Sequence, residues 1–331
     1  MKIRPYLFSL LILGLALMLS LGIGSVFLSP AQLWAALTGH GTQTSAAILW
    51  AIRFPRTALI ALTGMALGGS GATFQGLFRN PLADPYLIGV ASGAGLGAIL
   101  AMSIHWPYTV LGLAAVPAAA FITGLLTVFL VYTFARVGGS VPVTNLILAG
   151  VAVSAFATSV TSYLMLRSTG ELRQAISWLL GGVSLSSWNV ILALVPYLAI
   201  GLTTMTLSGA ALNLLQFGDD QAAQMGLDVK RAKIIIIAAA SIVTAAAVSF
   251  AGIIGFVGLI IPHIVRIWWG ADYRRIVPLS ILGGASALLA ADILARIVIA
   301  PQELPLGIVT ALAGAPFFLW VLRRSKNQGF W

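Results

Sequence analysis

The sequence predicts an all-α integral membrane protein of about ten transmembrane helices, organised as a single domain over residues 1–331. Three observations predict this fold class. Hydrophobic residues make up 60% of the chain and charged residues only 8%, whereas about a quarter of a soluble domain is charged. The apolar residues form runs of about 20, the length that a helix needs to cross a bilayer. The runs also lack the short alternating polarity that marks the strands of a membrane β-barrel.

Ten apolar runs define the expected spans. In chain order they cover residues 6–28, 55–78, 86–104, 108–134, 141–166, 188–208, 233–251, 252–269, 276–298 and 305–322. The eighth run is short and is interrupted by Pro262 and His263, so we expect a partial or tilted span whose backbone needs neighbours to satisfy it. If that run does not span, the count falls to nine.

Basic residues indicate how these spans are oriented. An even number of spans places both termini on one side, and Lys and Arg are enriched on the cytoplasmic side. Of the 18 Lys and Arg residues, thirteen then lie on that side. The remaining five are Arg53, Arg56, Arg167, Arg173 and Arg296. This asymmetry favours ten spans with both termini cytoplasmic. It does not fit nucleic-acid binding, which needs basic residues on a soluble face.

The chain lacks a site for using ATP. The phosphate loop of a P-loop ATPase requires Gly-Lys followed by Ser or Thr, and none of the four lysines follows a glycine. Ion-coupled carriers usually keep ionisable residues inside the membrane. Of the eight acidic residues, only Asp292 falls in an expected span, and Arg296 is spaced to pair with it on a helix. We expect no catalytic site and no metal site, and we expect the driving energy to come from a partner.

One polar stretch interrupts the apolar chain and is a candidate for contact with that partner. Residues 217–233 read FGDDQAAQMGLDVKRAK and fall on the cytoplasmic side between the sixth and seventh spans. Acids at its start and basic residues at its end suit the dipole of a short helix. The pattern alone also fits a polar loop lying at the lipid headgroups.

Four segments together resemble the permease subunits of type II ATP-binding-cassette importers, the family that carries vitamin B12, haem and ferric siderophores. The first segment, from Arg53 to Gly95, contains RFPR and QGLFRNPLADP. The others are LILAGVAVS from Leu146, GDDQAAQMGLDVKRAK from Gly218, and AGIIGFVGLIIPHIVR from Ala251 continuing to Phe318 through ELPLG. They occur in the family's order over most of the chain. The resemblance implies the type II permease fold, with ten helices in each subunit.

The resemblance also implies a role for the polar stretch. Residues 217–231 resemble the short coupling helices that sit in a groove on a separate ATPase. The positions expected to make this contact are Gly218, Asp219, Asp220, Ala222, Ala223, Met225 and Gly226.

Two further sites follow from the same resemblance. At the outer face, Arg53, Arg56 and Arg296 match arginines that meet carboxylates of a periplasmic substrate-binding protein; arginines at helix ends also snorkel to headgroups. At the inner face, Asn80 and Leu82 match a cytoplasmic gate, with Val143 and Thr144 as its second layer. The family often has a polar residue at the position of Val143.

The partners and location expected from the resemblance complete the prediction. The permease is expected to be a homodimer with two copies of an ATPase, in a bacterial inner membrane, and to receive cargo from the periplasmic binding protein. It is expected to hold no cofactor itself, because ATP and Mg²⁺ bind to the ATPase. The cargo stays open among vitamin B12, haem and ferric siderophores, with a lean to B12 or haem, and an oxyanion is a further option. The alternative functions are an ATPase-independent carrier or channel, and a membrane scaffold or receptor.

Overall fold

The described part of the chain is built from helices alone. The computed structural model describes residues 3–24, 26, 28–104, 110–138, 141–167, 172–183 and 186–325. Within these ranges the regular elements are α-helices, one π-helical stretch and one 3-10 turn, with no strand. The predicted all-α class is therefore confirmed.

The predicted set of ten spans has ten counterparts among the described residues. Seven helices are long and apolar enough to cross a membrane, and three shorter apolar helices complete the set. The seven are α1 (Arg4–Gly22), α4 (Phe54–Phe78), α6 (Val110–Ala135), α7 (Val143–Arg167), α9 (Trp188–Leu207), α12 (Val229–Ala251) and α14 (Tyr273–Ile297). The shorter three are α5 (Val90–Met102), α13 (Val257–Trp269) and α15 (Leu306–Ser325).

Short elements connect the spans. They are α2 (Pro30–Leu37), α3 (Gln43–Ala47), the π-helical η1 (Ile48–Arg53), the 3-10 turn η2 (Pro85–Ile88), α8 (Leu172–Leu179), α10 (Gly209–Leu215) and α11 (Asp219–Gln224). Of these, only the helix at α11 was predicted. Helix α2 had a readable signal, because Ser29 and Gln32 form a reciprocal capping box at its start.

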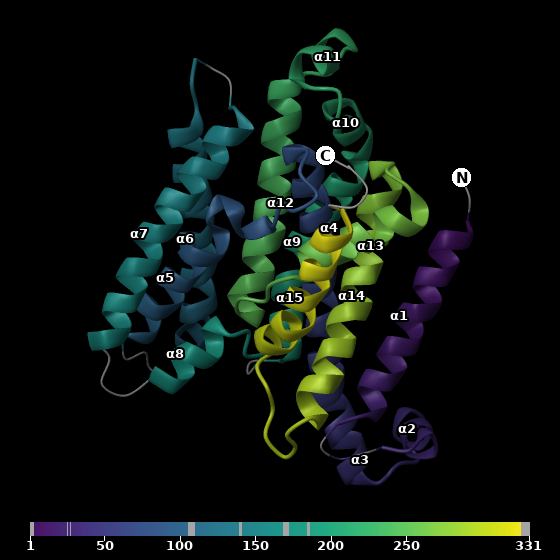
Figure 1. The fold of residues 1–331 in the computed structure, drawn as a ribbon. Helices are drawn as coiled ribbons and strands as arrows, with labels where there is room; N and C mark the ends of the chain where they lie inside the picture. The colour runs from purple at the N-terminus through teal and green to yellow at the C-terminus, as the bar shows by residue number, and fades with distance from the viewer. Residues whose placement is uncertain are drawn as a thin grey trace.

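The two ends of the helix bundle carry different elements. The start of α1, the end of α15 and helix α11 lie at one end, whereas α2, α3 and α8 lie at the other (Figure 1). We call these the inner end and the outer end. The shared position of both ends of the described chain agrees with an even number of crossings.

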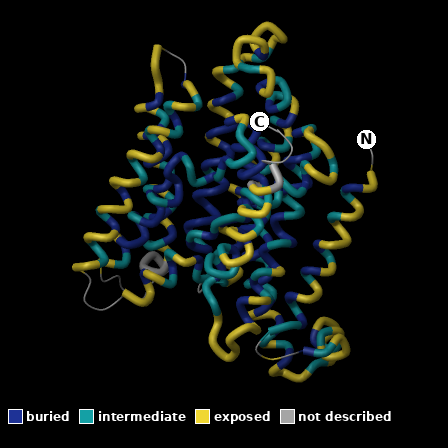
Figure 2. The backbone as a smooth tube through the Cα atoms, in the orientation of Figure 1, coloured by how far each residue is buried: buried dark blue, intermediate teal, exposed yellow. Residues whose placement is uncertain are grey.

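The core lies along α4, which is buried along most of its length and packs against α12 and α14 (Figure 2). Glycines let α4 and α14 approach closely. A Cβ atom on Gly64 would lie 2.3 Å from the carbonyl oxygen of Gly284, and one on Gly68 would lie 2.2 Å from that of Ser280. The small-residue spacing at Gly64 and Gly68 is therefore a packing device.

Two of the predicted spans are shorter than expected, because the backbone leaves the helix inside the bundle. Residues 252–256 are not helical, so α13 starts at Val257 rather than at 252. Gly252 and Phe256 have φ angles of 73° and 68°, which an α-helix cannot contain. The Tyr86 hydroxyl donates to the carbonyl of Ile254 at 2.9 Å and accepts from its N–H at 3.2 Å. The third span likewise begins with a 3-10 turn before α5. Of the first predicted span, 6–28, helix α1 covers the chain only as far as Gly22. Residues 25 and 27 of that span, and residues 108 and 109 of the fourth, lie outside the described residues.

Candidate functional site

Helix α11 projects from the inner end as a short, well-terminated helix (Figure 1). Asp219 and Asp220 occupy its first turn, where negative charge is favourable. At its end, the N–H of Gly226 bonds to the carbonyl of Ala223 at 2.9 Å and that of Leu227 bonds to the carbonyl of Ala222 at 3.0 Å. This pair of bonds is a Schellman motif, and Gly226 takes the positive φ, 88°, that the motif needs.

The predicted contact residues of this segment divide between surface and core. Ala222 is fully buried and belongs to the main hydrophobic core, so it anchors α11 to the bundle. Gly218 is half-buried. The exposed members are Asp219, Asp220, Ala223, Met225 and Gly226. Phe217 is also exposed beside them, at 62%. A firmly seated helix thus presents a mixed apolar and acidic surface.

One detail of the prediction is wrong. The basic residues 230, 231 and 233 do not cap the end of the short helix, because they lie in the first turns of α12. Asp228 caps that helix through a bond from the N–H of Arg231 at 3.0 Å. Lys233 is buried and pairs with Asp219, so it fastens α11 to α12.

Gln216 connects the start of this segment to the end of α4. Its side-chain amide donates to the carbonyls of Gly76 and Leu212, both at 2.8 Å. Gly76 lies in the last turn of α4, and its carbonyl also accepts from the N–H of Arg79 at 3.3 Å. The bond therefore joins the base of α11 to the helix that leads into the predicted gate.

Asn213 fastens α10 to α14. It donates to the Asp272 carboxylate at 2.7 Å and accepts from the N–H of Tyr273 at 2.8 Å. The hydrogen bond from Asn213 holds the pKa of Asp272 below its usual value; the Arg274 N–H and the charges of Arg274 and Arg275 add to this, while burial opposes it.

The predicted gate residues lie in two places. After α4, Arg79 adopts a left-handed conformation, and Asn80 accepts a hydrogen bond from the N–H of Leu82 at 2.9 Å. Val143 and Thr144 instead line a hollow of about 1020 Å³ at the inner end. The same hollow is lined by residues of the α11 segment, including Gly218, Asp219, Asp220 and Ala223. The hollow thus places the predicted second gate layer, Val143 and Thr144, beside the α11 segment; Asn80 and Leu82 do not line it, although the preceding residue Arg79 does.

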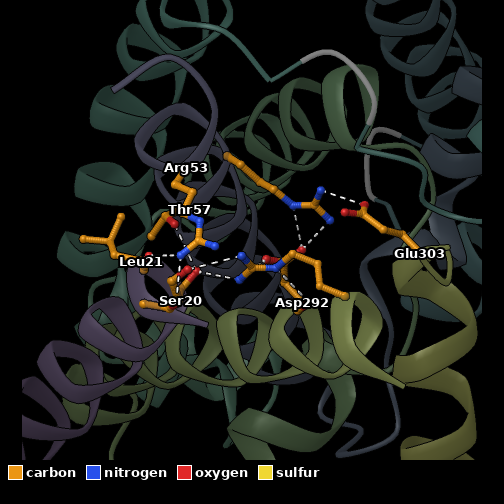
Figure 3. Close-up of polar contacts among 9 residues, drawn as sticks. Ser20, Leu21, Arg53, Thr57, Asp292 and Glu303 are labelled. Atoms are coloured by element: carbon orange, nitrogen blue, oxygen red, sulfur yellow. Dashed lines mark hydrogen bonds and ion pairs between the residues drawn. The ribbon is translucent and has the colours of Figure 1, made fainter. Parts of the chain in front are cut away.

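At the outer end, two of the three predicted docking arginines are buried; Figure 3 shows Arg53 beside Ser20 and Leu21. Arg53 and Arg296 are each 5% exposed. Arg53 donates to the carbonyls of Leu21, Gly22 and Val26, with the bond to Gly22 at 2.8 Å. Arg296 donates to the Ser20 carbonyl at 3.2 Å. Together they satisfy the last carbonyls of α1, as cations at a helix C-terminus do.

Asp292 connects Arg56 to Arg296. It is fully buried and pairs with Arg296 at 2.9 Å, which is the helical pair predicted from their spacing. Arg56 donates to the same carboxylate from Nε at 3.0 Å and from Nη2 at 2.9 Å. Its Nη1 donates to Glu303 at 2.7 Å (Figure 3). We call Arg53, Arg56, Arg296, Asp292 and Glu303 the outer charge cluster.

These contacts give the arginines different roles. The guanidinium groups of Arg53 and Arg296 hold α1 against α4 and α14, so the geometry favours a structural role for both. Arg56 is 16% exposed at its side chain and reaches the surface. The docking prediction therefore rests mainly on Arg56.

Two functional candidates were not predicted. Glu303 stands in the ELPLG motif and is one of only eight acidic residues, which is a signal that sequence reasoning could have used. Gln216 carries no such signal, because an isolated glutamine does not reveal which carbonyl it meets. Among the described residues no group of His, Asp and Glu is placed to hold a metal ion.

Comparison with known proteins identifies the family. The FecCD transport family matches residues 11–324. The cobalamin import system permease BtuC of Halobacterium salinarum is 45% identical, over 85% of this chain and 74% of that protein. The hemin transport system permease HmuU of Yersinia pestis is 38% identical, over 99% of this chain and 98% of that protein.

A solved structure supports the same assignment. It shows an inward-facing conformation of a metal-chelate type ABC transporter and superposes with a TM-score of 0.84 at 30% identity, covering 97% of this chain and 98% of that chain. The type II permease fold predicted from the motifs is therefore confirmed. The chain belongs to the FecCD transport family and is a permease component of an ATP-binding-cassette importer.

Proposed function

We propose that this permease moves a metal chelate from the periplasm to the cytoplasm of a bacterium, driven by a separate ATPase that docks on α11. ATP and Mg²⁺ bind to that ATPase and not to this chain. The inner end then faces the cytoplasm with both termini, and residues 1–331 act as one transmembrane domain. The proposed contact surface on α11 consists of the exposed residues Asp219, Asp220, Ala223, Met225 and Gly226.

One observation carries the mechanism: one face of α11 is exposed, whereas the opposite face is attached to the helix bundle. Ala222 is buried in the core, Lys233 pairs with Asp219, and Gln216 bonds to the end of α4. A displacement of α11 by a partner would therefore reach α12 through the pair of Lys233 and Asp219, and α4 through Gln216 at the end of α10. Val143 and Thr144 line the adjoining hollow, so the proposed gate lies next to the element that would move.

The homodimer receives support from helix α7. Its most hydrophobic stretch is only 17% buried, the lowest share among the seven long helices. Hydroxyl side chains at Thr144, Thr158, Ser159 and Ser162 are nevertheless exposed along it. These exposed hydroxyl groups suit contact with lipid poorly. A second copy of the permease would cover them, or they would line a water-filled path between two copies.

The cargo proposal rests on the relatives. Their names refer to cobalamin and to hemin, which favours a vitamin B12 or haem cargo over a ferric siderophore. A carrier without an ATPase is the second candidate. It is disfavoured because Asp292, the acid inside an expected span, is neutralised by ion pairs with Arg56 and Arg296.

Reconstitution tests the proposal. The permease is placed in proteoliposomes with the partner ATPase and the substrate-binding protein, and uptake of labelled vitamin B12, haem and a ferric siderophore is measured with and without ATP. We expect ATP-dependent uptake of vitamin B12 or haem. Uptake of none of the three, with both partners bound, would contradict the chelate proposal.

A further inference from the structure

Arg56 divides its hydrogen-bond donors between two carboxylates. Nε and Nη2 donate to Asp292, which is fully buried, so one edge of the guanidinium group is held by α14. Nη1 donates to Glu303 at 2.7 Å. The part of the Arg56 guanidinium group that reaches the surface is thus the end with Nη1, which points away from Asp292. In this structure that end is paired with Glu303 (Figure 3).

Glu303 is held much less firmly than Asp292. Its side chain is 44% exposed, compared with 0% for Asp292. It lies between α14 and α15, in residues 298–305, where the described chain is not helical. An ion pair with one partner this exposed contributes little to stability. Glu303 can therefore leave Arg56 at small cost, whereas Asp292 cannot.

The charge of the cluster favours an additional acid from outside. Within the cluster, Arg56 and Arg296 pair with the two carboxylates, whereas Arg53 meets only backbone carbonyls, so the cluster carries one positive charge in excess. The outward end of Arg56 can receive a carboxylate through two parallel hydrogen bonds, the strongest geometry for this pair. Glu303 already accepts a hydrogen bond from Nη1, one of the two nitrogens needed. An incoming carboxylate therefore has to displace Glu303 or be repelled by its negative charge.

We propose that Glu303 occupies the position on Arg56 that a carboxylate of the substrate-binding protein takes on docking. Docking then replaces the Glu303 carboxylate on Arg56 by the carboxylate of the partner. This inference rests on the proposed function. In the free permease Glu303 keeps Arg56 paired and fixed in position. On docking, Glu303 is released, and the segment 298–305 loosens with it. Glu303 thus weakens docking while keeping the docking arginine oriented.

Affinity measurements test the exchange. The wild-type permease and three variants are placed in nanodiscs, and binding of the purified substrate-binding protein of the same transport system is measured. Glu303→Gln should bind about fivefold more tightly at low salt, since removing a like charge a few ångströms away is worth about 1 kcal/mol in a wet environment. The gain should shrink as salt rises. Arg56→Gln should lose most of the binding, and the neighbouring control Gln302→Ala should match wild type.

A spin label gives an independent readout of the same step. Because the chain contains no cysteine, a nitroxide can be attached at Gln302→Cys alone. Label mobility should rise on Glu303→Gln, and it should also rise in the Glu303-containing protein when the substrate-binding protein docks. Tighter binding by Glu303→Gln together with release of the label supports the exchange.

The failures can be told apart. If wild type binds the substrate-binding protein and Arg56→Gln does not, but Glu303→Gln binds equally or more weakly, the exchange is overturned and the proposed docking function stands. Unchanged label mobility on docking overturns it too. If wild type binds no substrate-binding protein, both the proposed function and the exchange fail.

Discussion

Charged side chains are arranged differently at the two ends of the molecule. At the outer end, Arg53 and Arg296 turn inward and bond to the last carbonyls of α1, and Arg296 shares the fully buried carboxylate of Asp292 with Arg56. At the inner end, α11 keeps both acids of its first turn and Met225 at the surface. The outer charges mainly hold helices together, while the inner surface is left open for a partner. Substitutions at the outer end should therefore change stability, and substitutions on α11 should change energy coupling.

The largest effect is expected at Asp292. Asp292→Asn leaves Arg296 and part of Arg56 buried without a counter-charge, and removing one partner of a buried pair costs about 3–5 kcal/mol. Thermal unfolding in detergent, followed by the loss of helical circular dichroism, should show a clearly lower melting temperature. Glu303→Gln is the matched control, because its pair is exposed and should shift unfolding little. Equal melting temperatures for Asp292→Asn and wild type would contradict a structural outer cluster.

Met225 offers the corresponding test at the inner end. Met225→Glu places a charge on the exposed apolar part of α11 without straining the backbone, since its φ is −80°. Burying that charge against the ATPase should reduce ATP-driven uptake at least about tenfold, with an unchanged melting temperature. Met225→Leu should retain uptake. This position is a better probe than Gly226, where any side chain strains the positive φ. Normal uptake by Met225→Glu would remove α11 from the contact.

Sequence reasoning anticipated the helix at the inner end more readily than the contacts at the outer end. The α11 segment is continuous in the chain, so its residues could be considered together. The outer charge cluster joins positions 53, 56, 292, 296 and 303, and only the pair of Asp292 and Arg296 is local. Burial of Arg53 could not be predicted, because it depends on where the end of α1 lies. The break at 252–256 had a visible signal in Gly252 and Gly255, yet the apolar run concealed it.

Gln216 provides a smaller test of the connection between α11 and α4. Gln216→Leu keeps the size of the side chain but removes the bond to the Gly76 carbonyl, worth about 0.5–1.5 kcal/mol. ATP hydrolysis by the reconstituted complex should persist while uptake per ATP falls about threefold. Gln221→Leu, on the exposed face of α11, is the control for a general effect of losing an amide. If uptake per ATP stays the same in Gln216→Leu, α11 acts on the bundle by another route.

The smallest effect concerns pH and Asp272. Because the pKa of Asp272 is lowered in the folded protein, its contribution to stability is present above the unfolded pKa, about 3.9. That contribution is lost as pH falls through the lower folded value. The melting temperature of Asp272→Asn should lie slightly below that of wild type at neutral pH, and the two should converge as pH drops below about 4. A difference that stays constant across this range would show that charge on Asp272 does not matter.

The central claim is that energy reaches this permease from a separate ATPase through α11. It is tested most directly by measuring cargo accumulation against a gradient in vesicles that contain the permease alone, and in vesicles that also contain the ATPase, the substrate-binding protein and ATP. The account predicts accumulation only in the complete system, and its loss in that system with Met225→Glu. Accumulation by the permease alone, without nucleotide, would contradict it.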